Sequence, residues 1–366
     1  HDLPFSLPLS YVVPLPNSAV GEQHMPADAD GFTGGVAPAV GLRTLATDFW
    51  VSRALHVSVK LGLADLLANG PKNVDTLAVE SGANADALFR LMRVLAAHNI
   101  FVEQDDKQFG LTSWGEMLRS DKPGSMHDYV LMAGQPSAWQ ACENLEYSVM
   151  TGNTAFDHVL GQSWFAYLDA NPQVGGIFDK AMRSRGAAED AAILGVFDFS
   201  KFRRIADLGA GEGGLLSAAL QAAPQANGIL FDQPRVVENA RRAFANRAVS
   251  DRIEFVAGDL FDAVPTGAEL YVLKQILHDW SDDRAQNILA ACRSAMSPAS
   301  RLLVLEMIVE PEATFSKRMD LMMMAWTGGR ERTQHEFEQL LSNAGFRLIC
   351  TNRTITPICV LEAELA

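Results

Sequence analysis

The sequence predicts an α/β protein with a doubly wound parallel sheet in its second half and a smaller, mainly helical domain before it. An apolar run at 205–208 leads through a glycine-rich turn, 209–214, into a stretch of helical composition. This order of strand, glycine turn and helix is the nucleotide-binding corner of such sheets. Further strand-like and helical stretches then alternate regularly up to residue 306. The last two apolar segments, 346–354 and 355–365, predict an antiparallel hairpin at the edge of the sheet.

Composition narrows the class of protein. The 366 residues are enough for two domains, and 48% hydrophobic with 20% charged residues is typical of a globular protein. A net charge of −14 argues against nucleic acid as a partner, because its binding sites are basic. The four cysteines lack metal-ligand spacing, which predicts reduced thiols and a cytoplasmic protein. No apolar run approaches the length of a membrane span, so we expect no membrane partner.

Residues 1–40 are predicted to be a flexible lead-in. Residues 3–20 are apolar but contain four prolines, and the sequence opens with His1-Asp2, which does not match a signal peptide. Met25 is a candidate start, so residues 1–24 carry no functional argument.

Residues 41–120 predict a winged-helix-like domain. Apolar spacing over 42–67 predicts one long helix; Asp75 and Asn84 are candidate N-caps of two shorter helices, and a hairpin follows. The helix at 85–98 has only two arginines among its apolar residues, too few to bind a DNA groove. We therefore expect a dimerisation domain, with a DNA-binding regulator as an alternative. Residues 121–200 predict a helical connector whose aromatic side chains contribute to a substrate pocket.

The glycine turn is compatible with two cofactors. Gly209, Gly211 and Gly214 match the dinucleotide fingerprint, and Asp232 ends the next predicted strand, where it could bind the ribose of NAD in an oxidoreductase. Asp207, however, would repel a pyrophosphate at the helix N-terminus. It suits S-adenosylmethionine (SAM), which carries an ammonium and a sulfonium group and no phosphate. The acidic residue therefore favours SAM.

The predicted strands of this half end in charged residues, Asp232, Asp259, Lys274 and Glu306. Ligands of such sheets bind at the carboxyl ends of the strands. The functional site is therefore expected at this edge.

Five segments in this order carry a specific resemblance: DLGAGEG, FDQP, GDLF, LKQILHDWSDD and GGRERTQHEFEQLLSNAGF. Over residues 41–366 the chain resembles the plant and bacterial small-molecule O-methyltransferases of the caffeic acid and acetylserotonin type. The resemblance implies a Rossmann-like SAM-binding catalytic domain over 201–366 and a homodimer formed through the N-terminal domain. It also implies methylation of a phenolic hydroxyl, with S-adenosylhomocysteine (SAH) as the second product. The alanine-rich composition indicates a bacterial natural-product pathway.

The resemblance also implies a cofactor site. Asp232 would bind both ribose hydroxyls, while Gly209 and Gly211 would let the backbone approach the cofactor. Asp259 and Leu260 would bracket the adenine, where the family often has methionine in place of this leucine. Trp280 would stack near the adenine face, and Lys274 would lie near the methionine end.

The catalytic residues implied by the resemblance centre on His278 as general base, a role that a histidine of ordinary pKa can fill toward a phenol. Glu306 and Glu331 stand in the matching motifs, and one of them would fix the histidine tautomer. Asp279 is either part of the substrate site or a helix cap. The implied mechanism needs no metal.

The methionine-rich run 319–326 predicts a wall for a flat aromatic substrate, with Met323 and Trp326 as candidates, or else plain core or dimer interface. Met182 matches a substrate-lining methionine of the family. Use of SAM for chemistry such as hydroxylation remains an alternative function.

Overall fold

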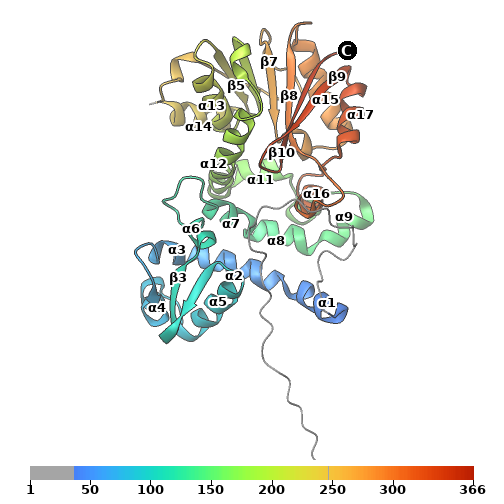
Figure 1. The fold of residues 1–366 in the computed structure, drawn as a ribbon. Helices are drawn as coiled ribbons and strands as arrows, with labels where there is room; N and C mark the ends of the chain where they lie inside the picture. Colours follow the sequence, from blue (N-terminus) through green and yellow to red (C-terminus); the bar gives the residue numbers. More distant parts are fainter. Residues whose placement is uncertain (1–36, 246) are drawn as a thin grey trace, which may run out of the picture. The chain divides into compact units, whose positions relative to one another are not determined.

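The computed structural model describes residues 37–245 and 247–366 (Figure 1). The chain forms two units, divided after Asp48, and each is described by itself. The described part of the first unit is helix α1 (Pro38–Thr47). The flexible lead-in predicted for 1–40 lies largely outside the described residues. Its predicted limit at residue 40 is wrong, because α1 already begins at Pro38.

The second unit, Phe49–Ala366, begins with the predicted winged-helix-like part. Its small sheet has the order β1-β3-β2 around a core that includes Leu77, Met92 and Phe109. The elements are α2 (Phe49–Lys60), α3 (Leu63–Leu66), β1 (Lys72–Asn73), α4 (Val74–Ser81), α5 (Ala85–Ala97), β2 (Phe101–Gln104), η1 (Asp105–Lys107), β3 (Gln108–Leu111) and α6 (Ser113–Glu116).

Two sequence predictions for this region are wrong in detail. The single helix expected over 42–67 is three helices, because Asp48 ends α1 and Gly62, at φ 65°, separates α2 from α3. The N-cap of α4 is Asn73, whose side chain accepts from the Asp75 backbone, rather than Asp75 itself. Asn84 caps α5 as predicted.

Residues 121–200 are helical, as the sequence predicts. The long helix α12 packs against α7 and against the first helix of the large sheet, α13 (Gly214–Ala222). One helix of this region can therefore carry side chains into a site at the sheet edge. The elements are α7 (His127–Ala133), α8 (Pro136–Glu143), α9 (Leu145–Thr151), α10 (Ala155–Leu160), α11 (Trp164–Ala170), α12 (Pro172–Leu194) and η2 (Phe199–Lys201).

The large sheet has seven strands in the order β6-β5-β4-β7-β8-β10-β9, and β10 pairs antiparallel with both β8 and β9 (Figure 1). The predicted doubly wound sheet and its edge hairpin are confirmed. The strands are β4 (Arg204–Leu208), β5 (Asn227–Asp232), β6 (Ile253–Ala257), β7 (Leu270–Lys274), β8 (Arg301–Met307), β9 (Phe346–Arg353) and β10 (Ile358–Leu365).

Helices cover both faces of this sheet. Alternate residues of each buried strand point to opposite faces and therefore enter different cores. Leu230 packs with residues of α13 and α14, whereas Phe231 packs with residues of α15 and α17. The remaining elements are α14 (Pro234–Phe244), η3 (Ser250–Arg252), η4 (Leu277–Asp279), α15 (Asp282–Ala295), α16 (Thr314–Trp326) and α17 (Gln334–Asn343).

The turn after β4 requires its glycines. Gly209, Gly211 and Gly213 have φ values of 71°, 58° and 72°, in the region that favours glycine. A Cβ at Gly209 would also overlap the Ile276 side chain. The chain can therefore turn sharply from the carboxyl end of β4 into α13.

Within the described ranges, none of the helices combines the length and the hydropathy that crossing a membrane requires. The domain limits 41–120, 121–200 and 201–366 stay predictions, since residues 49–366 form one compact unit.

Candidate active site

A cavity of about 660 Å³ lies where the sequence places the site, at the carboxyl ends of the parallel strands. Side chains from α11, α12 and α16 complete its wall. Thirteen of the predicted site residues line it: Met182, Asp207, Gly209, Gly211, Asp232, Asp259, Leu260, Lys274, His278, Asp279, Trp280, Met323 and Trp326. The other two, Glu306 and Glu331, are buried behind His278.

The part of the cavity beside the glycine turn is rich in carboxylates. Asp207 is buried at the end of β4, and burial together with the nearby Asp190 raises its pKa to about 7 despite the opposing Lys274 ammonium. Asp232 accepts backbone hydrogen bonds from Gly211 at 2.8 Å and Gln233 at 2.7 Å. Burial raises the pKa of Asp232 to about 6 in spite of these bonds. A cationic ligand here would favour the ionised form of both acids.

Lys274, at the end of β7, is held by two acids that sequence reasoning missed. Its Nζ lies 2.6 Å from Asp190 Oδ1 and 3.2 Å from Glu189 Oε2, both on α12. No motif marks this acidic pair, and only the packing of α12 brings it to the sheet edge. Burial raises the pKa of Asp190, while Lys274 opposes the rise.

An aromatic group borders the cavity near Asp259 and Leu260. The Trp280 ring stacks on Phe165 of α11, with centroids 5.7 Å apart, and meets Phe261 edge-on at 4.8 Å. The Arg284 guanidinium lies 4.6 Å from the centroid of Trp280. This arrangement offers a flat, apolar surface suited to a heteroaromatic base.

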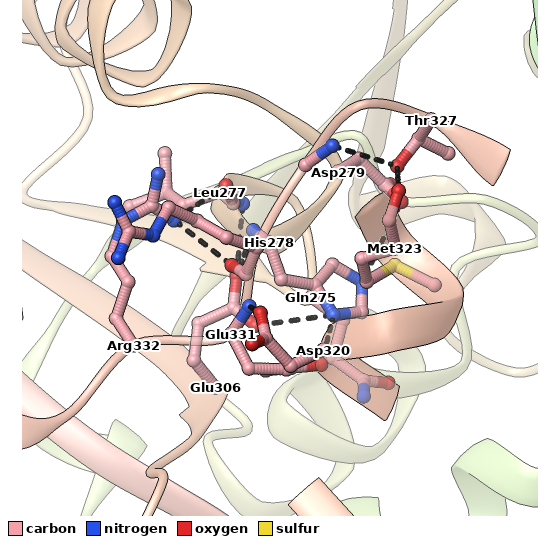
Figure 2. Close-up of polar contacts among 12 residues, drawn as sticks. Gln275, Leu277, His278, Asp279, Glu306, Asp320, Met323, Thr327, Glu331 and Arg332 are labelled. Atoms are coloured by element: carbon pink, nitrogen blue, oxygen red, sulfur yellow. Dashed lines mark hydrogen bonds and ion pairs between the residues drawn. The ribbon is translucent and has the colours of Figure 1, made fainter. Parts of the chain in front are cut away.

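His278 is the centre of a buried acid cluster on η4 (Figure 2). Its Nδ1 lies 2.9 Å from Glu331 Oε1 in a hydrogen bond, and Glu331 comes from the loop before α17. Glu306, on β8, turns Oε1 toward the backbone and accepts from the N–H groups of Ile276, Leu277 and His278 at 3.0, 2.8 and 3.3 Å. The nearest Glu306 oxygen is 3.9 Å from Nδ1. Glu331 thus contacts the ring, whereas Glu306 holds the backbone that carries it.

Asp279 lies near the other ring nitrogen, with Oδ1 3.8 Å from His278 Nε2. It is not a helix cap, because the N-cap of α15 is Ser281. Burial raises the pKa of Asp279 to about 6, although the His278 charge opposes this.

The charge around His278 favours its protonated form. Burial lowers the pKa of the imidazole, but the carboxylates of Glu306, Asp279 and Glu331 outweigh burial and raise the pKa to about 10. Burial also raises the pKa of Glu306 to about 7. The cluster therefore stabilises a proton on His278.

Two residues of the GGRERT segment support this cluster and were missed from the sequence. The fully buried Arg332 donates to the backbone oxygens of Leu277 at 2.8 Å and Trp280 at 2.9 Å, which bracket the histidine. A Cβ at Gly329 would overlap the His278 carbonyl oxygen, so only glycine fits. The glycine and arginine of the motif were a signal for this packing.

His278, Glu306 and Glu331 each offer one ligand atom, and these atoms lie within 4.8 Å of one another. One oxygen of each glutamate is engaged, since Nδ1 pairs with Glu331 Oε1 and Glu306 Oε1 accepts three backbone N–H groups. The second oxygens, Glu306 Oε2 and Glu331 Oε2, are buried and have no hydrogen-bond partner among the described residues. The hydrogen bond between Nδ1 and Glu331 fixes the ring for proton handling.

The remaining wall is formed by methionine and aromatic side chains. Met182 of α12 and Met323 of α16 line the cavity, and the rings of Trp164 and Trp326 stack with centroids 4.8 Å apart. Met323 and Trp326 are also buried in the core. The methionine-rich run is therefore part of both the core and the cavity wall, and its contact with a substrate stays a prediction.

Comparison with known proteins identifies the family. Residues 142–347 match the O-methyltransferase domain, and residues 44–121 match the O-methyltransferase dimerisation domain. The chain belongs to this methyltransferase family. This finding favours methyl transfer over the NAD-dependent and DNA-binding alternatives.

Relatives of known activity fall into two classes. The chain is 38% identical to the phenazine O-methyltransferase of Lysobacter antibioticus, over 88% of this chain and 95% of the relative. It is 36% identical to the 8-amino-8-demethylriboflavin N,N-dimethyltransferase of Streptomyces davaonensis, over 82% and 88% respectively. The family relation therefore establishes a methyltransferase and leaves the acceptor atom to be argued from the site.

A solved structure from neocarzinostatin biosynthesis shares the fold. That O-methyltransferase, in complex with SAM and 2-hydroxy-5-methyl naphthoic acid, is 32% identical, with a TM-score of 0.78 over 90% of this chain and 100% of that one.

Proposed function

We propose that this methyltransferase transfers the methyl group of SAM to a hydroxyl group of an aromatic small molecule, with His278 as general base. The observation that carries the proposal is the buried pair of His278 and Glu331 at the edge of a cavity walled by methionine and aromatic side chains. The relatives, which methylate aromatic metabolites according to their names, support it. A bacterial natural product is the expected substrate.

The cavity fits SAM better than a dinucleotide. Buried carboxylates at Asp207 and Asp190 would repel a pyrophosphate, whereas the ammonium and sulfonium of SAM would stabilise their ionised forms. Asp232 would bind the ribose with the lone pairs that its backbone donors leave free. Lys274 would lie near the methionine end, and Trp280 with Asp259 and Leu260 would border the adenine. When bound, SAM supplies an electrophilic methyl group on sulfur.

The hydrogen bond to Glu331 sets the tautomer of His278. Donation from Nδ1–H to the Glu331 carboxylate leaves the lone pair on Nε2, which can accept the proton of the substrate hydroxyl. A phenol has a pKa of about 10, close to the value of about 10 for His278, so the proton transfer is nearly balanced. The three carboxylates then stabilise the imidazolium that forms.

The strength of this base favours oxygen over nitrogen as the acceptor. A phenol is a poor nucleophile until its proton is removed, whereas a neutral aromatic amine already carries a lone pair. A histidine flanked by Glu331, Glu306 and Asp279 is therefore of most use to a hydroxyl substrate. Analysis of product mass with a library of phenols and anilines would decide between the acceptors and would also reveal any hydroxylation.

The central test of the base is His278→Ala. We expect turnover to fall by about 100-fold or more, while SAH binds with unchanged affinity, because the histidine acts on the acceptor. His335→Ala, at an exposed position on α17, is the matched control. Turnover close to wild type in the His278 variant would show that the base is elsewhere.

We also propose a homodimer. The dimerisation-domain match includes α2, whose first residues Phe49 and Trp50 are 48% and 65% exposed. Val149 and Met150 on α9 are 64% and 76% exposed. Exposed apolar side chains of this size indicate a partner surface. Light scattering at micromolar concentration should give twice the chain mass, and a monomer would contradict the proposal.

A further inference from the structure

Resting on the proposed function, we infer that Arg185 and Gln275 form an anion-binding subsite of the acceptor pocket and select aromatic substrates that carry a carboxylate beside the methylated ring. Arg185 lies outside the motifs that predicted the site, and Gln275 lies within the LKQILHDWSDD segment but was given no role there. Arg185 lies on α12, Gln275 follows β7, and both line the cavity.

The two side chains are hydrogen-bonded to each other, but each keeps an N–H group without an acceptor among the described residues. An Arg185 Nη2–H donates to Gln275 Oε1, which turns the Gln275 amide nitrogen away from the arginine. That nitrogen, Nε2, and Arg185 Nε are both buried and have no hydrogen-bond partner among the described residues. Buried N–H groups without acceptors cost free energy, and a ligand carboxylate would satisfy both.

The charge of Arg185 is only partly compensated. Its Nε lies 3.5 Å from Glu189 Oε1, an ion-pair distance that lacks hydrogen-bond alignment. The second Glu189 oxygen is closer to Lys274, at 3.2 Å, and Asp190 also pairs with Lys274. Because Lys274 takes the acidic pair at short range, the guanidinium fork keeps N–H groups for a ligand.

The backbone at Gln275 supports a functional role. Its φ is 53°, in the region that favours glycine, directly after Lys274 and three residues before His278. A non-glycine residue held in this conformation is strained, and such strain gathers at binding and catalytic sites. The conformation places the amide at the same strand end as the general base.

The position of Arg185 points to the acceptor rather than to SAM. Burial raises the pKa of Tyr129 on α7 and of Asp279 beside the His278 ring, and the positive charge of Arg185 lowers both, because the guanidinium lies near these two side chains. Asp190, further along α12, lies toward the glycine turn instead. Its Oδ2 would be 3.0 Å from a Cβ placed on Gly214, the first residue of α13. The helix thus separates a cofactor end at Asp190 from an acceptor end at Arg185.

Calorimetry with SAH-saturated protein tests the subsite without any methyl transfer. The probes are 1-naphthoate and its methyl ester, which share the ring and differ in charge. We expect the wild type to bind the acid at least about 10-fold more tightly than the ester, as a charge-assisted contact would give. Arg185→Met should remove this preference and leave SAH affinity and ester affinity unchanged. Arg242→Met, on the surface of α14 and 71% exposed, is the matched control.

Gln275→Glu keeps the side-chain size but supplies an internal carboxylate to Arg185, so it too should abolish the preference for the acid, even if Arg185→Met does not fold. Equal binding of acid and ester by the wild type, or an acid preference that survives Gln275→Glu, would overturn the subsite. Weaker SAH binding in Arg185→Met with the acid preference intact would assign Arg185 to the cofactor and also overturn it. Acid selection in a protein that methylates no phenol would instead refute the proposed function alone.

Discussion

Glu331→Gln isolates the charge of the carboxylate that contacts His278, the proposed general base. The amide keeps the size of the side chain and can still accept from His278 Nδ1, which lies 2.9 Å from Oε1. A hydrogen bond to a charged group contributes about 1.5–3 kcal/mol and one between neutral groups about 0.5–1.5 kcal/mol. The loss is therefore about 1–1.5 kcal/mol, which corresponds to a fall of about one unit in the pKa of His278. Glu306 and Asp279 remain, so the pKa should stay above its ordinary value.

The sign of the effect on rate follows from the form of histidine that acts. Only the neutral imidazole accepts a proton, so kcat/KM of the wild type should rise with pH up to the pKa of His278. Lowering that pKa moves the rise to lower pH by about one unit. The plateau should fall about 10-fold, because the imidazolium formed during transfer loses the same 1–1.5 kcal/mol.

The assay is a pH profile of kcat/KM for wild type and Glu331→Gln with one phenol substrate. Glu338→Gln, on α17 but outside the cluster, is the control. An acidic limb that does not move in Glu331→Gln would refute the coupling between this carboxylate and the titrating base. A shift to higher pH would show that the active form is the imidazolium.

Three further substitutions test the rest of the site. Asp207→Asn should weaken SAM binding by about 10-fold at pH 8, and the affinity of the wild type for SAM should rise with pH through about 7 as Asp207 ionises. Calorimetry at several pH values checks both expectations. A wild-type affinity that does not change with pH would contradict a role of Asp207 in binding SAM. Gly329→Ala should lower both the melting temperature and turnover, because its Cβ would overlap the His278 carbonyl oxygen. Gly176→Ala, inside α12 with open space around it, should lower neither, because alanine is the better helix former. Glu306→Ala should destabilise the fold by at least about 3 kcal/mol, since three backbone N–H groups lose their acceptor. Denaturant unfolding measures this loss, with Glu312→Ala at an exposed position as the control. Equal stabilities of the two variants would exclude a role of Glu306 in holding the backbone.

Much of the catalytic half was predictable because its signals are local. Buried parallel strands are continuous apolar runs, and charged residues at their ends, such as Asp232 and Lys274, necessarily gather at one edge of the sheet. The glycines at 209, 211 and 213 mark a turn that only positive φ allows. Sequence order therefore determined the fold class and the edge of the sheet that holds the cavity, whereas the role of His278 came from the family resemblance and stays a proposal.

Tertiary packing decided what the sequence left open. Glu306 and Glu331 lie in equally suggestive motifs, and only the folded chain shows that Glu331 contacts the ring while Glu306 accepts from three backbone N–H groups. Arg185 and Asp190 were missed because the rotation of α12 about its axis depends on contacts with α7 and α13, which are distant in sequence. Local patterns specify elements and their ends; the pairing of side chains across elements depends on a register that packing alone sets.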